Sequence, residues 1–226
     1  MKLAANSHLA PRALYQEVAE RLRLQIFARQ LEPGSWIDEL KLCAEMGISR
    51  TPMREALKVL AVEGLITMKV RRGAYVTEMS ERDVHEAYEL LSLLESDAAA
   101  RVADSASAAE IAELQQLHLA LERQHGEREA FFAANEVFHL RLLELAGNRW
   151  RLQIVNDLRR VMKLNRHHSL FKQGRLDDSL NEHRQLMGAL SSRNADQARR
   201  LMSQHFANGL AATRLANADP PASSTT

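Results

Sequence analysis

Residues 47–66 constrain the fold of this chain more than any other stretch, because they predict a helix with two different edges. Residues that favour a first helical turn mark its start, namely Ser49, Thr51 and Pro52. Apolar side chains then recur at the spacing of one helix face, at Met53, Ala56, Leu57 and Leu60. Cationic side chains recur every four residues along another edge, at Arg50, Arg54 and Lys58. One edge can pack while the other reaches a polyanion, although an ordinary amphipathic helix with a solvated basic edge explains this stretch equally well when it is taken alone.

The segments on either side favour a DNA-binding interpretation. Residues 38–46 predict a short helix with Asp38 as its N-cap, and Gly47 supplies the turn of a helix-turn-helix. Residues 65–70 and 74–77 suit two short strands, joined by the basic turn Arg71-Arg72-Gly73. A helix-turn-helix followed by such a hairpin is a winged helix. In this fold, arginine side chains of the second motif helix can reach guanine edges in the major groove.

These features resemble the winged-helix domain of GntR-type bacterial transcription regulators over about residues 11–78. The matching pieces are Pro33-Gly34, Leu40, residues 47–57, residues 63–66 and Gly73. The resemblance implies that Arg50 and Arg54 read base edges and that Leu40 replaces an arginine with which some members contact DNA. The full set of predicted DNA-binding residues is Ser49, Arg50, Thr51, Arg54, Lys58, Arg71, Arg72 and Gly73.

The length of 226 residues allows two modest domains. We expect a mainly α fold, with a flexible arm at 1–10, a winged-helix domain at 11–78, an all-helical domain at 79–216 and a disordered tail at 217–226. The net charge of +1 is unevenly distributed along the chain, because residues 1–77 carry 12 Lys and Arg against 8 Asp and Glu. This positive excess suits contact between the N-terminal part and phosphate.

The composition excludes several other classes of protein. Cys43 is the single cysteine, which rules out an intrachain disulfide and a zinc site built from several cysteines. The N-terminus has no signal h-region, and no apolar run approaches the ~18 residues of a membrane span. We therefore expect a soluble, cytoplasmic protein. The predicted helices outside the motif cover 11–31, 80–104, 107–125, 128–146, 148–169, 176–192 and 194–216.

Three histidines in the predicted helical domain fall on apolar helix faces. His139 stands one helical turn after Asn135, and His183 and His205 lie on the apolar stripes of two other helices. A single histidine on such a face is more often a hydrogen-bonded core residue than a ligand. Three of them favour a shared metal ion, since burying three imidazoles without a partner is costly. Neutral imidazole suits divalent zinc or nickel, with Asn135 as a fourth, weaker donor.

This half also resembles FCD, the helical ligand-binding domain of FadR-type GntR regulators. The matching pieces are Leu94-Glu95, Asn135-x-x-x-His139 with Phe138, Ala146-Gly147-Asn148, Ser179-x-x-Glu182-His183 and Met202-x-x-His205. The resemblance implies a metal held by Asn135, His139, His183 and His205, beside which a small organic acid binds by its carboxylate. Asparagine replaces the aspartate of many members, which weakens the site.

Leu91 stands where many members of the family direct an arginine at the effector. Five other arginines offer a substitute, although a surface position is the simpler interpretation for each: Arg101, Arg149, Arg159, Arg166 and Arg175. The pair His167-His168 is expected to be exposed, because adjacent helical side chains diverge by about 100°.

The combined prediction is a homodimeric repressor on a pseudopalindromic operator of double-stranded DNA, controlled by a small carboxylate effector. Two alternatives remain open from the sequence. One is a repressor for which the metal itself is the signal. The other is a three-histidine metal hydrolase, for which Glu182 is the nearest candidate base, although this alternative leaves the winged helix unexplained.

Overall fold

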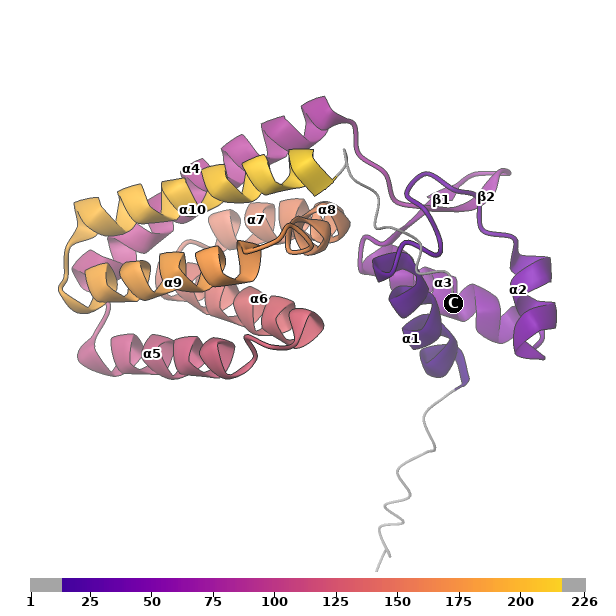
Figure 1. The fold of residues 1–226 in the computed structure, drawn as a ribbon, viewed down its shortest axis with the longest axis horizontal. Coiled ribbons are helices and arrows are strands. Elements are labelled where there is room, and N and C mark those ends of the chain that lie inside the picture. Colours follow the sequence, from indigo (N-terminus) through magenta and orange to yellow (C-terminus); the bar gives the residue numbers. More distant parts are fainter. Residues whose placement is uncertain (1–13, 217–226) are drawn as a thin grey trace, which may run out of the picture. The chain divides into compact units, whose positions relative to one another are not determined.

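The computed structural model describes residues 14–216, without the side chains of 214–216. The predicted arm, the first three residues of the predicted 11–31 helix and the predicted tail lie outside these residues. The chain divides into two compact units between Glu78 and Met79 (Figure 1). The predicted fold class is confirmed: a helix-turn-helix with a β-hairpin precedes a bundle made only of helices. None of the helices within the described part of the chain is long and apolar enough to cross a bilayer.

The first unit is a winged helix. It contains α1 (Leu14–Phe27), α2 (Glu39–Met46), α3 (Arg50–Val62), β1 (Ile66–Lys69) and β2 (Gly73–Val76). The two strands pair antiparallel, with Ile66 opposite Val76 and Lys69 opposite Gly73. The core between α1 and α3 is made of fully buried side chains, including Leu22, Ile26, Met53, Leu57 and Leu60. The apolar stripe predicted for α3 is therefore its packed face.

Local hydrogen bonds explain why the motif helices begin and end where they do. The Asp38 side chain accepts hydrogen bonds from the backbone amides of Leu40 and Lys41 and so caps α2. Gly47 ends this helix in the left-handed conformation, with φ of 64°, which is the conformation that glycine adopts most readily. Ser49 precedes α3 at the N-cap position, but its side chain makes no capping hydrogen bond.

The second unit is a bundle of helices. It comprises α4 (Glu81–Ser105), α5 (Ala108–Arg123), α6 (Arg128–Leu145), α7 (Arg149–Val161), α8 (Lys163–Ser169), α9 (Arg175–Ser191) and α10 (Ala195–Ala216). The helices α4 and α10 lie side by side along most of their length (Figure 1). The Ser80 side chain caps α4 by accepting from the Asp83 amide. Leu91, Leu114, Phe138, Leu142, Val155, Leu190 and Met202 are among the fully buried core residues.

Two predicted helices differ from the observed ones. The helix predicted at 11–31 ends at Phe27, and Arg29 in the following turn has a φ of 56°. The single helix predicted at 148–169 is wrong, because it breaks at Met162 into α7 and α8. Met162 is fully buried in the core, and the side chains of the short α8 are buried on nearly every side. A break without proline or glycine leaves no local signal in the sequence.

Candidate metal centre and DNA-contact surface

The basic edge of α3 is exposed, as a DNA-contacting helix requires. Arg50, Thr51, Arg54 and Lys58 are all exposed to solvent. The Nε of Arg54 donates to Glu39 Oε2 at 3.2 Å, and Lys58 Nζ lies 2.8 Å from Glu55 Oε1. Both ion pairs are solvent-accessible and therefore weak, so phosphate or base edges can compete for these cations.

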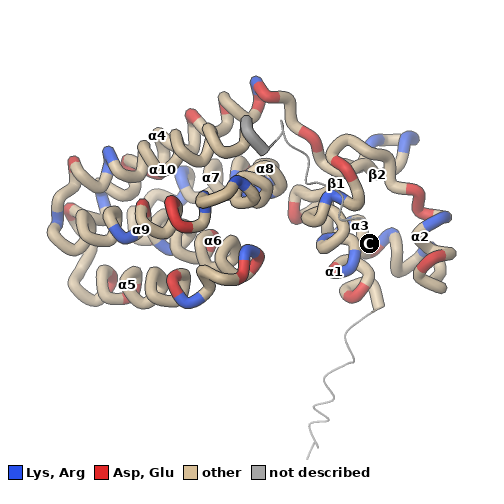
Figure 2. The backbone as a smooth tube through the Cα atoms, in the orientation of Figure 1, with Lys and Arg blue, Asp and Glu red and all other residues tan. Residues whose placement is uncertain are grey.

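The turn between β1 and β2 forms the basic wing tip (Figure 2). Arg71 and Arg72 are exposed, and Arg71 has a φ of 59°. Gly73 has a φ of 91°, and a Cβ at this position would lie 3.0 Å from Trp36 Nε1. Glycine is therefore favoured at this position both by the backbone conformation and by the close approach of Trp36. The eight DNA-binding residues remain a prediction, since contact with DNA is what would test them.

The three predicted histidine ligands come together inside the helical bundle. His139 of α6, His183 of α9 and His205 of α10 can each direct one nitrogen so that all three nitrogens lie within 4.8 Å of one another. Their ring centroids are 5.0 to 5.2 Å apart. His139 and His183 are 0% and 1% exposed. These three residues are called the histidine triad below.

A buried carboxylate, Glu95, and a partly buried one, Glu182, orient the triad. The Nδ1 of His139 lies 2.7 Å from Glu95 Oε2, and the Nδ1 of His205 lies 2.6 Å from Glu182 Oε2. An imidazole that donates through Nδ1 to a carboxylate leaves its Nε2 lone pair available for a metal, which is the arrangement common to histidine metal ligands.

Several polar atoms at the triad have no hydrogen-bond partner among the described residues. They are His139 Nε2, both ring nitrogens of His183, and the neighbouring Asn135 Oδ1. Buried polar atoms are normally satisfied, so a cluster of unsatisfied nitrogens and an amide oxygen needs a shared partner. A neutral imidazole offers one lone-pair nitrogen, so His139, His183 and the Asn135 amide oxygen can each offer one electron pair to a divalent cation.

Burial keeps the triad in the neutral, metal-binding form. It lowers the pKa values of His139 and His183 well below the ordinary value, and nearby positive charges lower them further. Burial also lowers the pKa of His205, although Glu182 acts in the opposite direction. Nitrogen ligands on one tetrahedral zinc ion lie about 3.4 Å apart, given Zn–N bonds of about 2.1 Å. The triad therefore fits a divalent metal after a modest closure, and Asn135 as a fourth donor remains a prediction.

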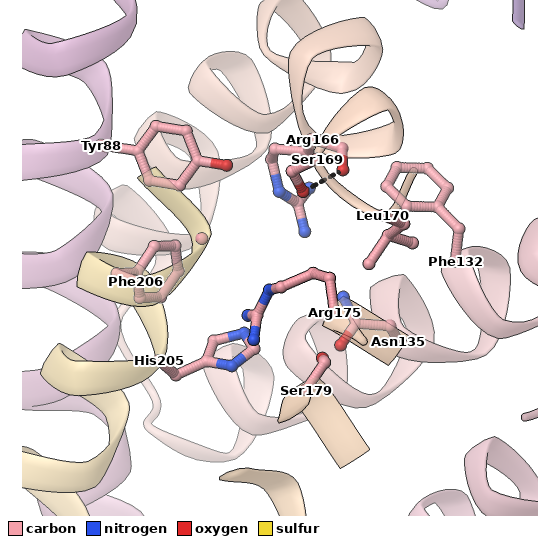
Figure 3. Close-up of a pocket in the computed structure, with 11 residues that line it drawn as sticks. Tyr88, Phe132, Asn135, Arg166, Ser169, Leu170, Arg175, Ser179, His205 and Phe206 are labelled. Carbon is pink, nitrogen blue, oxygen red and sulfur yellow. Dashed lines mark hydrogen bonds between the residues drawn. The ribbon is translucent and has the colours of Figure 1, made fainter. Parts of the chain in front are cut away.

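A pocket lies directly beside the triad. Its lining includes His205, Asn135, Tyr88, Phe206 and Phe132, together with Ser169, Leu170, Ser179, Gly209 and two arginines. Figure 3 shows the guanidinium groups of Arg166 and Arg175 directed into this space, with that of Arg175 next to His205. The pocket thus combines a candidate metal site with cationic, hydroxyl and aromatic groups, the mixture expected of a site for a small polar ligand.

Three of the five arginines expected at the surface are in fact buried. Arg159, Arg166 and Arg175 are 5%, 8% and 4% exposed, whereas Arg101 and Arg149 are exposed as expected. A signal for Arg159 was present, because it continues the four-residue spacing of Arg151 and Val155 on the buried face of α7. The expectation for His167 and His168 is also wrong. Both are buried, since α8 is enclosed on nearly all sides.

Salt bridges hold the buried arginines. Arg159 donates to both oxygens of Glu95 at 2.7 and 2.5 Å and to Glu136 at 2.9 Å. Arg166 also contacts Glu136. Arg175 donates through both terminal nitrogens to Glu182 at 2.7 and 2.9 Å. Leu91, the position of the family's arginine, is fully buried in the apolar core.

Glu182 is already occupied by other side chains, which argues against the hydrolase alternative. It accepts hydrogen bonds from His205, Arg175 and the side-chain amide of Asn208. Although burial raises the pKa of Glu182, hydrogen bonds from His205 and Arg175 lower it to about 2. A carboxylate with so low a pKa is a poor general base at neutral pH.

Comparison with known proteins adds independent evidence. Residues 14–76 match the model of "Bacterial regulatory proteins, gntR family", and residues 86–208 match that of the FCD domain. The chain is 30% identical to the HTH-type transcriptional regulator YdhC of Bacillus subtilis, over 87% of this chain and 89% of that protein. It is 28% identical to the HTH-type transcriptional repressor RspR of Escherichia coli K12, over 84% and 85% of the two chains. The solved structure of E. coli McbR/YncC shares the fold, with a TM-score of 0.68, 22% identity and coverage of 91% of this chain and 99% of that one.

Proposed function

Because this chain belongs to the GntR family of bacterial transcription regulators and carries an FCD domain, we propose that it is a homodimeric repressor whose operator affinity is set by a small organic acid bound near a metal. The observation that carries this proposal is the position of the pocket. It opens beside the histidine triad, in which His139 and His183 are buried and have unsatisfied nitrogens, and two buried arginines enter it. A similar relative, RspR, is described as a repressor.

The proposed DNA contacts lie on α3 and the wing. Arg50 and Arg54 reach base edges in the major groove, where arginine can bind guanine O6 and N7 with two hydrogen bonds. Phosphate and backbone contacts come from Ser49, Thr51, Lys58, Arg71, Arg72 and Gly73. Arg54 must exchange its ion pair with Glu39 for a base, and the exposure of that pair supports the exchange.

The proposed effector site uses the triad and the pocket together. His139, His183, His205 and Asn135 would hold zinc or nickel, and Glu95 and Glu182 fix the orientation of two of the histidines. The ion, when bound, would supply positive charge to a ligand carboxylate. Arg166 and Arg175 lie on the pocket side, and Tyr88 and Phe206 enclose the rest of the ligand.

Exposed apolar side chains support pairing through the helical unit. Leu90 and Leu93 of α4 are 48% and 62% exposed, and Trp150 and Ile154 of α7 are 60% and 49% exposed. Because α4 and α7 contact each other, a second copy that covers both would bury these side chains. Two paired chains present two copies of α3, which is the geometry that a pseudopalindromic operator requires.

The test is to measure operator binding by protein with a defined metal content. A duplex selected from random sequence would be titrated with metal-free protein, zinc-loaded protein and zinc-loaded protein plus each acid of a carboxylate panel. The proposal expects one class of acid to change operator affinity in the zinc-loaded protein. If the metal-free and zinc-loaded proteins differ and no acid has a further effect, the metal-sensing alternative replaces it. The metal-sensing alternative has support of its own. Both pocket arginines already pair with glutamates, so neither is free to bind an acid.

A further inference from the structure

The ion pairs beside the pocket are buried or partly buried, and their formal charges cancel. Arg159 and Arg166 pair with Glu95 and Glu136, and Arg175 pairs with Glu182. Each of these carboxylates lies at salt-bridge distance from at least one of the three guanidinium groups. The pocket therefore carries two arginines and yet has no net positive charge to offer a ligand.

Each pocket arginine already has an internal anion where a ligand carboxylate would bind. Both terminal nitrogens of Arg175 are taken by Glu182, in the two-bond geometry that a ligand carboxylate would use. Arg166 contacts Glu136, which also holds Arg159. An incoming acid must displace a glutamate or share its arginine with it, and either route adds a negative charge to a set of ion pairs whose charges already cancel.

We propose that Glu136 and Glu182 act as internal counter-charges that prevent Arg166 and Arg175 from holding a carboxylate by themselves, so that the pocket accepts an anion only after a divalent metal has added positive charge at the triad. This inference rests on the proposed effector site. It adds that metal loading controls whether the pocket can bind the acid.

Glu136 is the better residue for a test. Glu182 also bonds to His205, so its replacement disturbs the triad directly. Glu136 instead bonds to Arg159 and contacts Arg166, and its side chain is 30% exposed. Glu136→Gln removes one negative charge and keeps the shape of the side chain. Arg159 retains both of its bonds to Glu95.

The experiment measures acetate binding to metal-free and zinc-loaded protein by calorimetry and thermal shift, with acetamide as the neutral control of the same shape. Metal-free wild type should not distinguish acetate from acetamide, whereas zinc-loaded wild type should bind acetate. Metal-free Glu136→Gln should gain acetate affinity on the order of tenfold, the low end of the effect of a neighbouring opposite charge. The double variant Glu136→Gln/Arg166→Gln restores the charge balance and should lose this gain.

The matched control is Glu144→Gln. Glu144 also lies on α6 and also pairs with an arginine, Arg141, but it is at the surface and does not line the pocket. Equal acetate binding by metal-free and zinc-loaded wild type would overturn the inference. So would a Glu136→Gln variant with a native circular dichroism spectrum and no gain. A zinc-loaded wild type that binds no member of the carboxylate panel contradicts the proposed acid effector instead, and the Glu136→Gln result still decides the role of the counter-charges.

Discussion

Replacing His183 with leucine should stabilise the metal-free protein, which is the opposite of what replacing an ordinary core histidine would do. The His183 side chain is buried, and neither of its ring nitrogens has a hydrogen-bond partner among the described residues. A buried polar group left unsatisfied costs about 1–3 kcal/mol. Leucine is similar in volume and has no polar atom. His183→Leu should therefore raise the free energy of unfolding of the metal-free helical unit by about 1–3 kcal/mol.

Adding metal should reverse which of the two proteins, wild type or His183→Leu, has the larger free energy of unfolding. Zinc at a free concentration of 100 times its dissociation constant stabilises a one-site protein by about 2.7 kcal/mol. Wild type should show this gain, and His183→Leu should not, because the variant lacks one ligand. The difference between the two proteins thus changes sign, or shrinks to zero, between chelator and zinc.

Urea denaturation followed by circular dichroism measures both effects, with chelator in one series and zinc in the other. His205→Leu is the matched control. It removes another ligand of the triad, but the Nδ1 of His205 bonds to Glu182, so its loss should destabilise the metal-free protein. A His183→Leu variant that is destabilised by more than 1 kcal/mol without metal, and a wild type that zinc does not stabilise, would together refute the reasoning.

Three further measurements test the remaining parts of the site. Glu95→Gln removes one of the two charged partners of the buried Arg159 and should lower the free energy of unfolding by about 3 kcal/mol in the same denaturation experiment. A decrease smaller than about 1 kcal/mol would contradict the buried ion pair. The pKa of Glu182 is about 2 in the folded protein, below its ordinary value of 4.5, so its contribution to stability is complete above about pH 4.5 and is lost as the pH falls toward 2. Glu182→Gln should flatten this acid limb of the stability curve, and an unchanged limb would assign it to other groups. Arg50→Ala and Arg54→Ala should each weaken operator binding by about 1–3 kcal/mol in an anisotropy titration while the dimer persists; wild-type affinity in either variant removes that residue from the base-reading set.

The winged helix could be predicted because its signals are local. Asp38 and Gly47 bound α2, and the apolar stripe through Met53 and Leu57 is the buried face of α3. Each of these features acts over a few residues, within the range that the spacing of a sequence reports. The paired strands of the wing follow from the turn that ends at Gly73.

The bundle could be predicted only in part. The histidine triad could be predicted because each member lies on an apolar stripe of its own helix. The buried salt bridges could not be predicted, since Glu95 contacts His139 and Arg159 from 44 and 64 residues away in the sequence. Helical periodicity reports which face is buried, but it does not report which side chain of another helix lies opposite. The break at Met162 is a packing effect and carries no local signal.

The measurement that tests the central claim most directly is the response of operator affinity to acid in wild type and His183→Leu. Fluorescence anisotropy with the selected duplex would be recorded for the zinc-loaded proteins, with and without the acid identified by the panel. We predict that both proteins bind the duplex, since Arg50 and Arg54 are intact, and that only wild type changes its affinity when acid is added. A His183→Leu variant that responds to acid as fully as wild type would contradict control of DNA binding through the triad.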